Sequence, residues 1–408
     1  MSPFLIDGEV TVEYSRLLSE VARSTSYFPC LQTDNLARYF TNLIRAMVAD
    51  LPVTLIDSDV SFGEITDLKA DQINAPSAYS APAIDGIDDL IERVRNSKAE
   101  ITIFTSGTTG QPKKVTHSVA ALTRSVRIGQ RYSSNIWAFA YNPTHMAGLQ
   151  VFFQAFLNKN TLVNIFRKSP AEIRDAIARQ RVTHISATPT FYRMLLPAVK
   201  AFPAVSRATL GGEKSDSRLY AQISKLFPSA KINNVYASTE AGTLFAAKGD
   251  CFMLPADAKD KFKVVDGELL IHKSLLGISD SFEFDGDYYH SGDLIEWADG
   301  SDTTFRFAGR KNELINVGGY KVNPTEVEAA IIRLGGIVNA KVYGKPNSVL
   351  GNVLCADIVK EAESELAEVE LKLKLRQTLQ DFKVPRRIKF VDRLSTTRTG
   401  KIKRQNDE

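Results

Sequence analysis

Residues 169–181 carry the hydrophobic and polar pattern of an amphipathic helix. Ser169 is a suitable N-cap, Pro170 suits the first helical position, and Glu172 stands three residues after the cap, as in a capping box. The apolar segment 182–189 that follows predicts a short buried strand. A capped helix that leads into a buried strand is typical of an α/β fold.

The same alternation continues along the chain. A further helix is predicted over 190–199, and strands that end in polar loops are predicted over 207–213 and 231–240. Strands that alternate with helices predict parallel sheets with helices on both faces. We therefore expect an α/β protein whose ligands bind at the loops beyond the carboxyl ends of the strands.

The C-terminal quarter begins with a well-marked helix. Asn323 is a suitable cap, Pro324 opens the helix, Glu326 has capping-box spacing and Gly335 ends it. The apolar positions in between fall on one face.

Smaller elements follow this helix. Two strands and an amphipathic helix are predicted, over 338–343, 353–359 and 361–380. Together they predict a small α+β domain with a boundary near residues 309–314. We place the large domain at 1–311 and the small domain at 312–408.

The composition is that of an ordinary globular protein. The 408 residues are 44% hydrophobic and 24% charged, which suits a chain of about two or three domains. The net charge of +4 slightly favours anionic ligands, but lysines and arginines form no stripe, which argues against nucleic-acid binding. Cys30, Cys251 and Cys355 lie far apart without nearby histidine pairs, which argues against a disulfide framework and a zinc site.

Nothing in the sequence predicts export or membrane insertion. The first ten residues hold two acids and no basic leader, unlike a signal peptide. No apolar run reaches the roughly 18 residues that a membrane-spanning helix needs. We expect a soluble, cytoplasmic protein.

The segment 103–117 concentrates glycine, serine and threonine just before Lys113 and Lys114. Glycines let backbone N–H groups turn toward a ligand, and hydroxyl groups add donors, so the segment predicts a phosphate site. Either lysine is placed to neutralise the anion. The G-x-x-x-x-G-K-S/T spacing of a P-loop is absent. The alternative is an ordinary flexible surface loop.

The stretch TSGTTGQPK (105–113) closely resembles the phosphate-loop signature of the adenylate-forming superfamily. That superfamily includes acyl-CoA synthetases, aryl-CoA ligases, luciferases and the adenylation domains of peptide synthetases. The resemblance implies that Lys113 offsets the charge of ATP phosphates. It also implies that the phosphates are cradled by Thr105, Ser106, Gly107, Thr108, Thr109 and Gly110. Further motifs in the superfamily's order extend the resemblance over nearly the whole chain.

The segment NVYASTEAG (234–242) is similar to the superfamily's YGxTE motif, with Ala237 in place of the usual glycine. The resemblance implies that Tyr236 stacks on adenine and Thr239 contacts phosphate. It also implies that Glu240 binds Mg²⁺, a metal that prefers hard oxygen ligands. A solvated surface carboxylate is the alternative for Glu240.

Two short motifs each supply one charged residue. YYHSGDL (288–294) resembles the motif whose acid, here Asp293, binds the ribose hydroxyls, although SGD alone is a common turn. LSTTRTGKIKR (394–404) resembles the C-terminal signature that carries the adenylation lysine, here Lys401. A lysine on a lid stabilises charge that develops at the α-phosphate. A basic C-terminal tail is the alternative.

The segment 307–328 resembles the superfamily's linker motif. Arg310 is expected to reach the ribose or a phosphate, and Asn312 stands at the hinge position, where Asp or Lys is usual. Asn tolerates unusual backbone angles there. Gly318 and Gly319 match the loop that lines the pantetheine tunnel, and an ordinary turn before a helix is the alternative.

The acyl pocket is implied by weaker similarities. The segment 141–149 resembles the one that carries an aromatic or histidine gate, here His145, although a lone histidine is also commonly structural. The segment 187–191, together with Gly212 and Glu213, matches pocket walls and the adenine edge.

The main departure from the superfamily lies at the start of the chain. Segments 4–21 and 35–59 resemble the usual opening hairpin, helices and strand. The region before the phosphate loop is nevertheless shorter than usual. We expect a trimmed N-terminal domain whose acyl or CoA surface is built differently.

The resemblance implies an AMP-forming acyl- or aryl-CoA synthetase that uses ATP, Mg²⁺ and coenzyme A. Its expected fold is a large N-terminal domain of parallel-rich sheets and a small, mobile α+β lid domain. A free acyl carrier protein is the alternative acceptor to CoA. The segment 141–149 lacks the Asp that usually pairs the amine of an α-amino acid, which disfavours amino acids as substrates. An aromatic or medium-chain carboxylic acid is taken as the working hypothesis for the substrate.

Two other classes of protein are weighed against this one. An inactive nucleotide-binding homologue is disfavoured because Glu240, Asp293, Arg310 and Lys401 are all present. An unrelated kinase or ATPase would need a Walker or kinase signature, and the sequence has neither.

Overall fold

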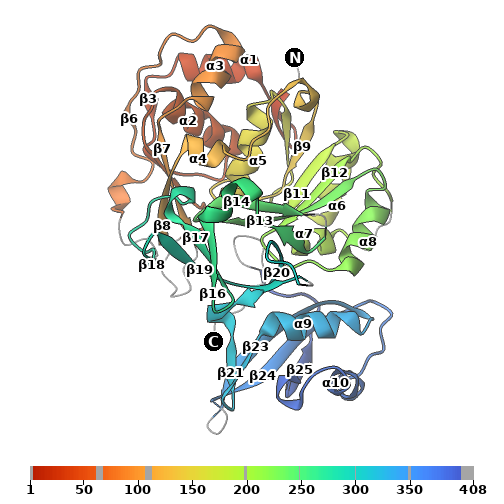
Figure 1. Cartoon of the computed structure of the whole chain (residues 1–408). Helices are drawn as coiled ribbons and strands as arrows, with labels where there is room; N and C mark the ends of the chain where they lie inside the picture. The colour runs from red at the N-terminus through yellow and green to blue at the C-terminus, as the bar shows by residue number, and fades with distance from the viewer. Residues whose placement is uncertain are drawn as a thin grey trace.

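The computed structural model describes residues 3–60, 68–105, 113–196, 200–247, 249–298, 300–347 and 351–396. Figure 1 shows the C-terminal sheet with its two helices, in blue, below the rest of the chain. None of the helices in these ranges is long and apolar enough to cross a membrane.

The largest sheet has eight strands in the order β14-β13-β12-β11-β9-β10-β1-β2. The six strands from β13 to β1 pair in parallel, and β14 and β2 add antiparallel edges. Their bounds are β1 (Pro3–Asp7), β2 (Val10–Glu13), β9 (Ile136–Phe139), β10 (Thr161–Asn164), β11 (His184–Ala187), β12 (Arg207–Gly211), β13 (Lys231–Ser238) and β14 (Gly242–Ala247).

Helices cover both faces of this sheet, as predicted. Neighbouring residues of a strand point to opposite faces, so Phe139 and Ala138 of β9 belong to two different hydrophobic cores. One core is built with α1 (Tyr14–Ala22), α2 (Leu36–Val48), α3 (Gly86–Arg95), α4 (Val119–Thr123) and α5 (Met146–Phe156). The other is built with α6 (Pro170–Arg179), α7 (Pro189–Met194) and α8 (Ser217–Leu226).

Local signals set the start of α6. Ser169 Oγ accepts the N–H of Glu172, and the Glu172 carboxylate accepts the N–H of Ser169. The predicted capping box is therefore confirmed. It satisfies two of the N–H groups that a helix start leaves open.

Three further sheets complete the part of the chain before residue 311. A four-stranded sheet consists of β4 (Cys30–Gln32), β5 (Val53–Ile56), β7 (Glu100–Thr105) and β8 (Lys113–Ser118). A two-stranded sheet pairs β3 (Ser26–Tyr27) with β6 (Ser77–Ala78). An antiparallel sheet consists of β15 (Cys251–Met253), β16 (Phe262–Val265), β17 (Glu268–His272), β18 (Phe284–Asp285), β19 (Tyr288–Trp297) and β20 (Thr304–Arg310).

The C-terminal sheet carries two helices on one face. Its strands are β21 (Ile315–Val317), β22 (Tyr320–Val322), β23 (Ile337–Asn347), β24 (Gly351–Lys360) and β25 (Arg387–Phe390). The helices are α9 (Pro324–Arg333) and α10 (Glu368–Arg376), and both contribute to the buried core of this sheet. The fold is thus the expected one, with large parallel-rich sheets followed by a small α+β unit.

Two local predictions in this region were wrong. Asn323 caps α9 through the N–H of Thr325, but Glu326 closes no capping box, because its carboxylate binds Lys383 Nζ at 2.8 and 3.0 Å. The helix predicted over 361–380 is only Glu368–Arg376. Residue Glu361 instead donates its N–H to Gly336 and pairs its carboxylate with an arginine of α8, so tertiary contacts replace the first turns of the expected helix.

Candidate active site

Four of the predicted site segments follow adjacent strands of the eight-stranded sheet. They lie just after the carboxyl ends of β9, β11, β12 and β13, and comprise His145, the segment 188–191, Gly212 with Glu213, and Thr239 with Glu240. Parallel strands end at one edge of a sheet, so the fold gathers these segments along that edge.

The loops after β11 and β12 are tied together by Glu213. Its Oε2 accepts hydrogen bonds from the Thr190 N–H at 3.0 Å and the Thr190 hydroxyl at 2.7 Å. Gly212 has φ +83°, a left-handed conformation that favours glycine. The predicted glycine and acid therefore lie in one turn that is hydrogen-bonded to the loop after β11.

The predicted nucleotide residues Tyr236, Asp293 and Arg310 form one hydrogen-bonded group. Asp293 is 5% exposed and accepts from Arg310 Nε at 2.8 Å and from the Tyr236 hydroxyl at 2.5 Å. Antiparallel pairing of β19 with β20 places Asp293 opposite Arg310. The Asp293 carboxylate raises the pKa of Arg310, and burial followed by the same carboxylate raises that of Tyr236. Through this group, β13 of the eight-stranded sheet is hydrogen-bonded to β19 of the antiparallel sheet.

The ring of Tyr236 already lies in an aromatic stack. Its centroid is 4.2 Å from that of Phe307, with 19° between the planes, and 5.8 Å from that of Phe245. Sequence reasoning did not identify Phe307, although it stands three residues before Arg310 in the linker motif. Phe307 therefore occupies one face of the Tyr236 ring.

Glu240 presents a half-buried carboxylate with no hydrogen bond or ion pair to any residue in the described ranges. No three His, Cys, Asp or Glu side chains in those ranges gather into a metal site by themselves. This fits Mg²⁺, which is usually held by one or two carboxylates together with substrate phosphates. The lone acid is thus chemically suited to its predicted role.

Sequence reasoning missed a buried acid beside this group, Glu268. It is 3% exposed and accepts from Lys311 Nζ at 2.9 Å, Gly292 N–H at 2.9 Å and His290 Nδ1 at 3.3 Å. Burial acts to raise the pKa of Glu268, but these hydrogen bonds hold it below its usual range. Glu268 therefore anchors both the residue before Asp293 and the residue before Asn312.

His145 has a partner that its neighbours in sequence do not reveal. Asp57, directly after β5, is 7% exposed and accepts from Asn142 Nδ2 at 2.5 Å. His145 Nε2 lies 3.4 Å from the same carboxylate. Burial opposes ionisation, yet the hydrogen bond to His145 lowers the pKa of Asp57 to about 2. The segment 141–149 contains no Asp, but the fold supplies one from residue 57.

The phosphate loop itself lies outside the described residues, as do Ser106, Gly107, Thr108, Thr109, Gly110 and Lys401. Its two ends are described. Thr105 ends β7, Lys113 begins β8, and the two residues pair directly across the hairpin. The hairpin thus brackets the loop.

The predicted hinge and tunnel residues lie beyond β20. Asn312 is in a short 3-10 turn over Lys311–Glu313. Gly318 and Gly319 form the turn between β21 and β22 with φ values of +59° and +88°, which favour glycine. No hydrogen bond between described residues joins this turn to the strand-end loops. The structure does not bring the two glycines into that group.

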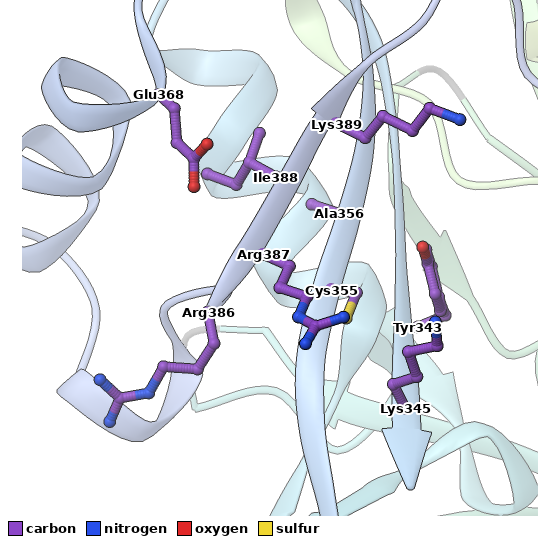
Figure 2. A pocket seen from close by; sticks show the side chains of 9 residues that line it. All are labelled: Tyr343, Lys345, Cys355, Ala356, Glu368, Arg386, Arg387, Ile388 and Lys389. Atoms are coloured by element: carbon purple, nitrogen blue, oxygen red, sulfur yellow. The ribbon is translucent and has the colours of Figure 1, made fainter.

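A basic hollow of about 360 Å³ lies on the C-terminal sheet, and none of the residues that line it is a predicted site residue. Figure 2 shows Arg387 of β25 beside Cys355, with Lys345 on the neighbouring strand β23. Lys389 and Arg386 add two more cations. Of these four cations only Arg386 has an ion pair, with Asp381, among the described residues.

Family comparison gives two matches. An AMP-binding enzyme model matches residues 46–266, and an AMP-binding enzyme C-terminal domain model matches residues 326–401. Together they cover most of the chain.

Individual relatives are more distant. A Mycobacterium tuberculosis propanoyl:CoA ligase, named for a methyl-dioxo-octahydroindenyl acyl group, is 28% identical over 357 residues, which is 80% of this chain and 69% of the relative. Human mitochondrial acyl-coenzyme A synthetase ACSM4 is 28% identical over 358 residues, 76% of this chain but only 60% of that relative.

A solved structure shows the same fold. O-succinylbenzoate coenzyme A synthetase (MenE) from Bacillus subtilis, in complex with ATP and magnesium ion, superposes with a TM-score of 0.72 at 19% identity. The superposition covers 98% of this chain and 95% of that one.

Proposed function

The chain belongs to the AMP-binding enzyme family, and from that premise we propose that it is an AMP-forming acyl- or aryl-CoA ligase. It activates a carboxylic acid as an acyl-adenylate and then transfers the acyl group to coenzyme A. The observation that carries the proposal is the hydrogen-bonded Tyr236–Asp293–Arg310 group, centred on the buried Asp293, beside the unengaged carboxylate of Glu240. The ligase names of the relatives support the same activity.

In the first half-reaction a carboxylate oxygen of the acid attacks the α-phosphorus of ATP. A P–O bond forms, the bond to the β-phosphate oxygen breaks, and pyrophosphate leaves with its electron pair. Asp293 accepts hydrogen bonds from the ribose, and Arg310, paired with Asp293, faces the same nucleotide. Lys113 and the loop before it hold the phosphates, and Lys401 approaches the α-phosphate.

Glu240 is the residue that would hold Mg²⁺, which supplies charge neutralisation on the phosphates when bound. This carboxylate is free to do so because it has no partner among the described residues. Every other charge in the nucleotide group is already paired, as in the Asp293–Arg310 contact.

In the second half-reaction the thiol sulfur attacks the acyl carbonyl carbon. The C–S bond forms, the C–O bond to AMP breaks, and the thiol proton passes to solvent. Rotation of the small domain about Asn312 brings the Gly318–Gly319 turn to the acyl-adenylate. One active site then serves both steps, because the small domain presents Lys401 to the site in the first step and the Gly318–Gly319 turn in the second.

The cations of the basic hollow are our candidates for the phosphate groups of CoA. Lys345, Arg387 and Lys389 have no ion pair among the residues that the structure describes. β25, which carries two of them, pairs with the same edge of β24 as β21, the strand before the Gly318–Gly319 turn. The CoA phosphates and the thiol arm would therefore use one edge of one sheet.

The test is pyrophosphate release with ATP, Mg²⁺ and a panel of aryl and medium-chain acids, with and without CoA, followed by mass spectrometry. We expect a CoA thioester from one class of acid. Asp293→Asn should lower kcat/KM for ATP by about 100-fold or more, as loss of a charged contact costs about 3 kcal/mol. Asp287→Asn, an exposed acid before the same strand, is the matched control and should leave activity unchanged.

Other outcomes have separate meanings. Pyrophosphate release and an adenylate without any thioester would replace CoA by a carrier-protein acceptor. A chain that binds no ATP in the presence of Mg²⁺ would contradict the proposed function.

A further inference from the structure

The backbone around Glu240 is held through its three consecutive carbonyl groups, each of which accepts a hydrogen bond from a distant residue. The carbonyl oxygen of Thr239 accepts from His117 Nε2 at 2.8 Å, and that of Glu240 accepts from the Gly277 N–H at 2.8 Å. The carbonyl oxygen of Ala241 accepts from Arg124 Nη2 at 2.7 Å. The peptide units on both sides of Glu240 are therefore fixed by partners from distant parts of the chain.

His117 comes from the strand that leaves the phosphate loop. It is 3% exposed and lies in β8, the strand that begins at Lys113. It pairs with Ile101 across the hairpin. A single short strand thus links a predicted phosphate-binding lysine to the segment of the predicted metal ligand.

Gly277, which donates to the carbonyl oxygen of Glu240, packs directly on the imidazole of His117. A Cβ at this position would lie 2.5 Å from His117 Cε1 and 2.7 Å from Nδ1, so only glycine permits the approach. Thr116 and Ile278 fix the same approach through two reciprocal backbone hydrogen bonds of 2.9 and 2.8 Å. Any side chain at 277 would move either the imidazole or the Glu240 segment.

Arg124, directly after α4, binds the same backbone segment from another side. Its Nη2 binds Ala241, and its Nη1 lies 3.3 Å from the carbonyl oxygen of Leu275. One guanidinium therefore bridges the Glu240 segment and the segment that contains Gly277. Its planar set of donors makes such a bridge, which a lysine ammonium reproduces poorly.

We propose that His117 and Arg124 are positioning residues that hold Glu240 where the Mg²⁺ of bound ATP needs it. Neither touches the nucleotide or the metal, and both act through the backbone of residues 239–241. The proposal rests on the function proposed above. It adds that the phosphate-loop hairpin and the metal ligand are built as one unit.

The expected loss of Mg²⁺-dependent ATP affinity can be judged from residues that orient metal ligands in other proteins. Partners that orient a metal ligand are worth about 10- to 100-fold in metal affinity. His117 and Arg124 act through the backbone rather than on the carboxylate itself, so we expect the lower end, about tenfold. Loss of either donor also leaves a carbonyl oxygen without its partner, which loosens the segment.

The experiment is calorimetric titration with ATP, without any acid substrate so that no turnover occurs, in Mg²⁺ and in EDTA. His117→Leu should raise Kd about tenfold in Mg²⁺ and leave Kd in EDTA unchanged. His117→Gln keeps an N–H donor at similar reach and should restore most of the affinity. A merely structural role would change both values together.

His184→Leu is the matched control. His184 is also largely buried and bonded to a hydroxyl group, that of Thr183, but it begins β11 at the opposite end of the sheet. We expect it to leave the ratio of the two Kd values unchanged. Arg124→Lys provides a second test that keeps the charge, and it should show the same magnesium-selective loss even if His117→Leu fails to fold.

Two results would overturn the proposal. Equal Kd changes in Mg²⁺ and EDTA, or no change in either, would show that His117 and Arg124 do not position the metal ligand. If the unmutated chain binds no ATP with Mg²⁺, the proposed function fails and this inference fails with it.

Discussion

Asp57→Asn tests how the fold supports His145. The substitution keeps the shape of the side chain and an oxygen that can accept from Asn142. It removes the charge that faces His145 Nε2 at 3.4 Å. We expect the variant to be less stable at neutral pH, by an amount that the ionisation of Asp57 sets.

The magnitude follows from the pKa of Asp57, about 2 against an ordinary 3.8. Each pKa unit corresponds to about 1.4 kcal/mol, so the ionised group would stabilise the fold by about 2.5 kcal/mol. Part of this site is open to water, since the nearby Arg167 side chain is 45% exposed. Screening by solvent reduces the expected loss to about 1–2 kcal/mol.

The sign of the pH dependence follows from the lowered pKa. The unfolded chain takes up a proton at Asp57 at higher pH than the folded chain does, so acid favours unfolding. The stabilisation is complete above about pH 5 and is lost as the pH falls from about 4 toward 2. The stability difference between the unmutated chain and Asp57→Asn should therefore close over that range.

The assay is urea unfolding at pH 7, 5, 4 and 3.5, followed by tryptophan fluorescence. Trp137 lies in β9, the strand that leads to His145, and reports on this sheet. Asp175→Asn is the control, because Asp175 forms an exposed pair with Arg179 and its loss should cost no more than about 0.5 kcal/mol. A loss below that value for Asp57→Asn, or a larger loss that stays constant down to pH 3.5, would refute the reasoning.

Four further changes probe the rest of the site. Glu268→Gln should cost about 1–3 kcal/mol in thermal unfolding, because it removes the charge of a buried carboxylate that accepts three hydrogen bonds, and it should raise KM for ATP; an unchanged Tm would contradict the anchoring role. Lys401→Ala should abolish adenylate formation yet spare thioester formation from supplied acyl-adenylate, and retention of both half-reactions would show that Lys401 is not the adenylation lysine. Asn312→Pro should fix one domain pose and uncouple the half-reactions, measured separately, whereas intact coupling would move the hinge elsewhere. Arg387→Ala should raise KM for CoA several-fold but not KM for ATP, and an unchanged KM for CoA would exclude the basic hollow as its phosphate site.

The shortened helix at 368–376 shows where pattern-based prediction loses its force. The segment from 361 has a helical pattern of charges and leucines, but Glu361 pairs with Arg218, 143 residues earlier in the chain. Glu326 likewise leaves the expected capping box for Lys383, 57 residues later. A long-range ion pair competes with a local bond of similar strength, and the sequence pattern does not contain the competitor.

The sequence alone determined the features that depend on contacts within a few residues or on the order of elements. The capping box at Ser169 closes between neighbours, and the alternation of strands and helices dictates a parallel sheet covered on both faces. That order also placed Glu213 and Glu240 at strand ends, and hence at one edge of the sheet. These predictions needed no knowledge of which distant segments would meet.

Tertiary structure decided which side chains support those residues. Asp57 reaches His145 because β5 ends beside the loop that follows β9, and Glu268 reaches Lys311 because β17 pairs with β19. His117 meets the backbone of Glu240 only because Gly277 leaves room for it. Each supporting residue is separated in sequence from the residue that it contacts by 43 positions or more. Whether the two meet depends on how whole sheets pack against one another, and a pattern within a few residues carries no information about that packing.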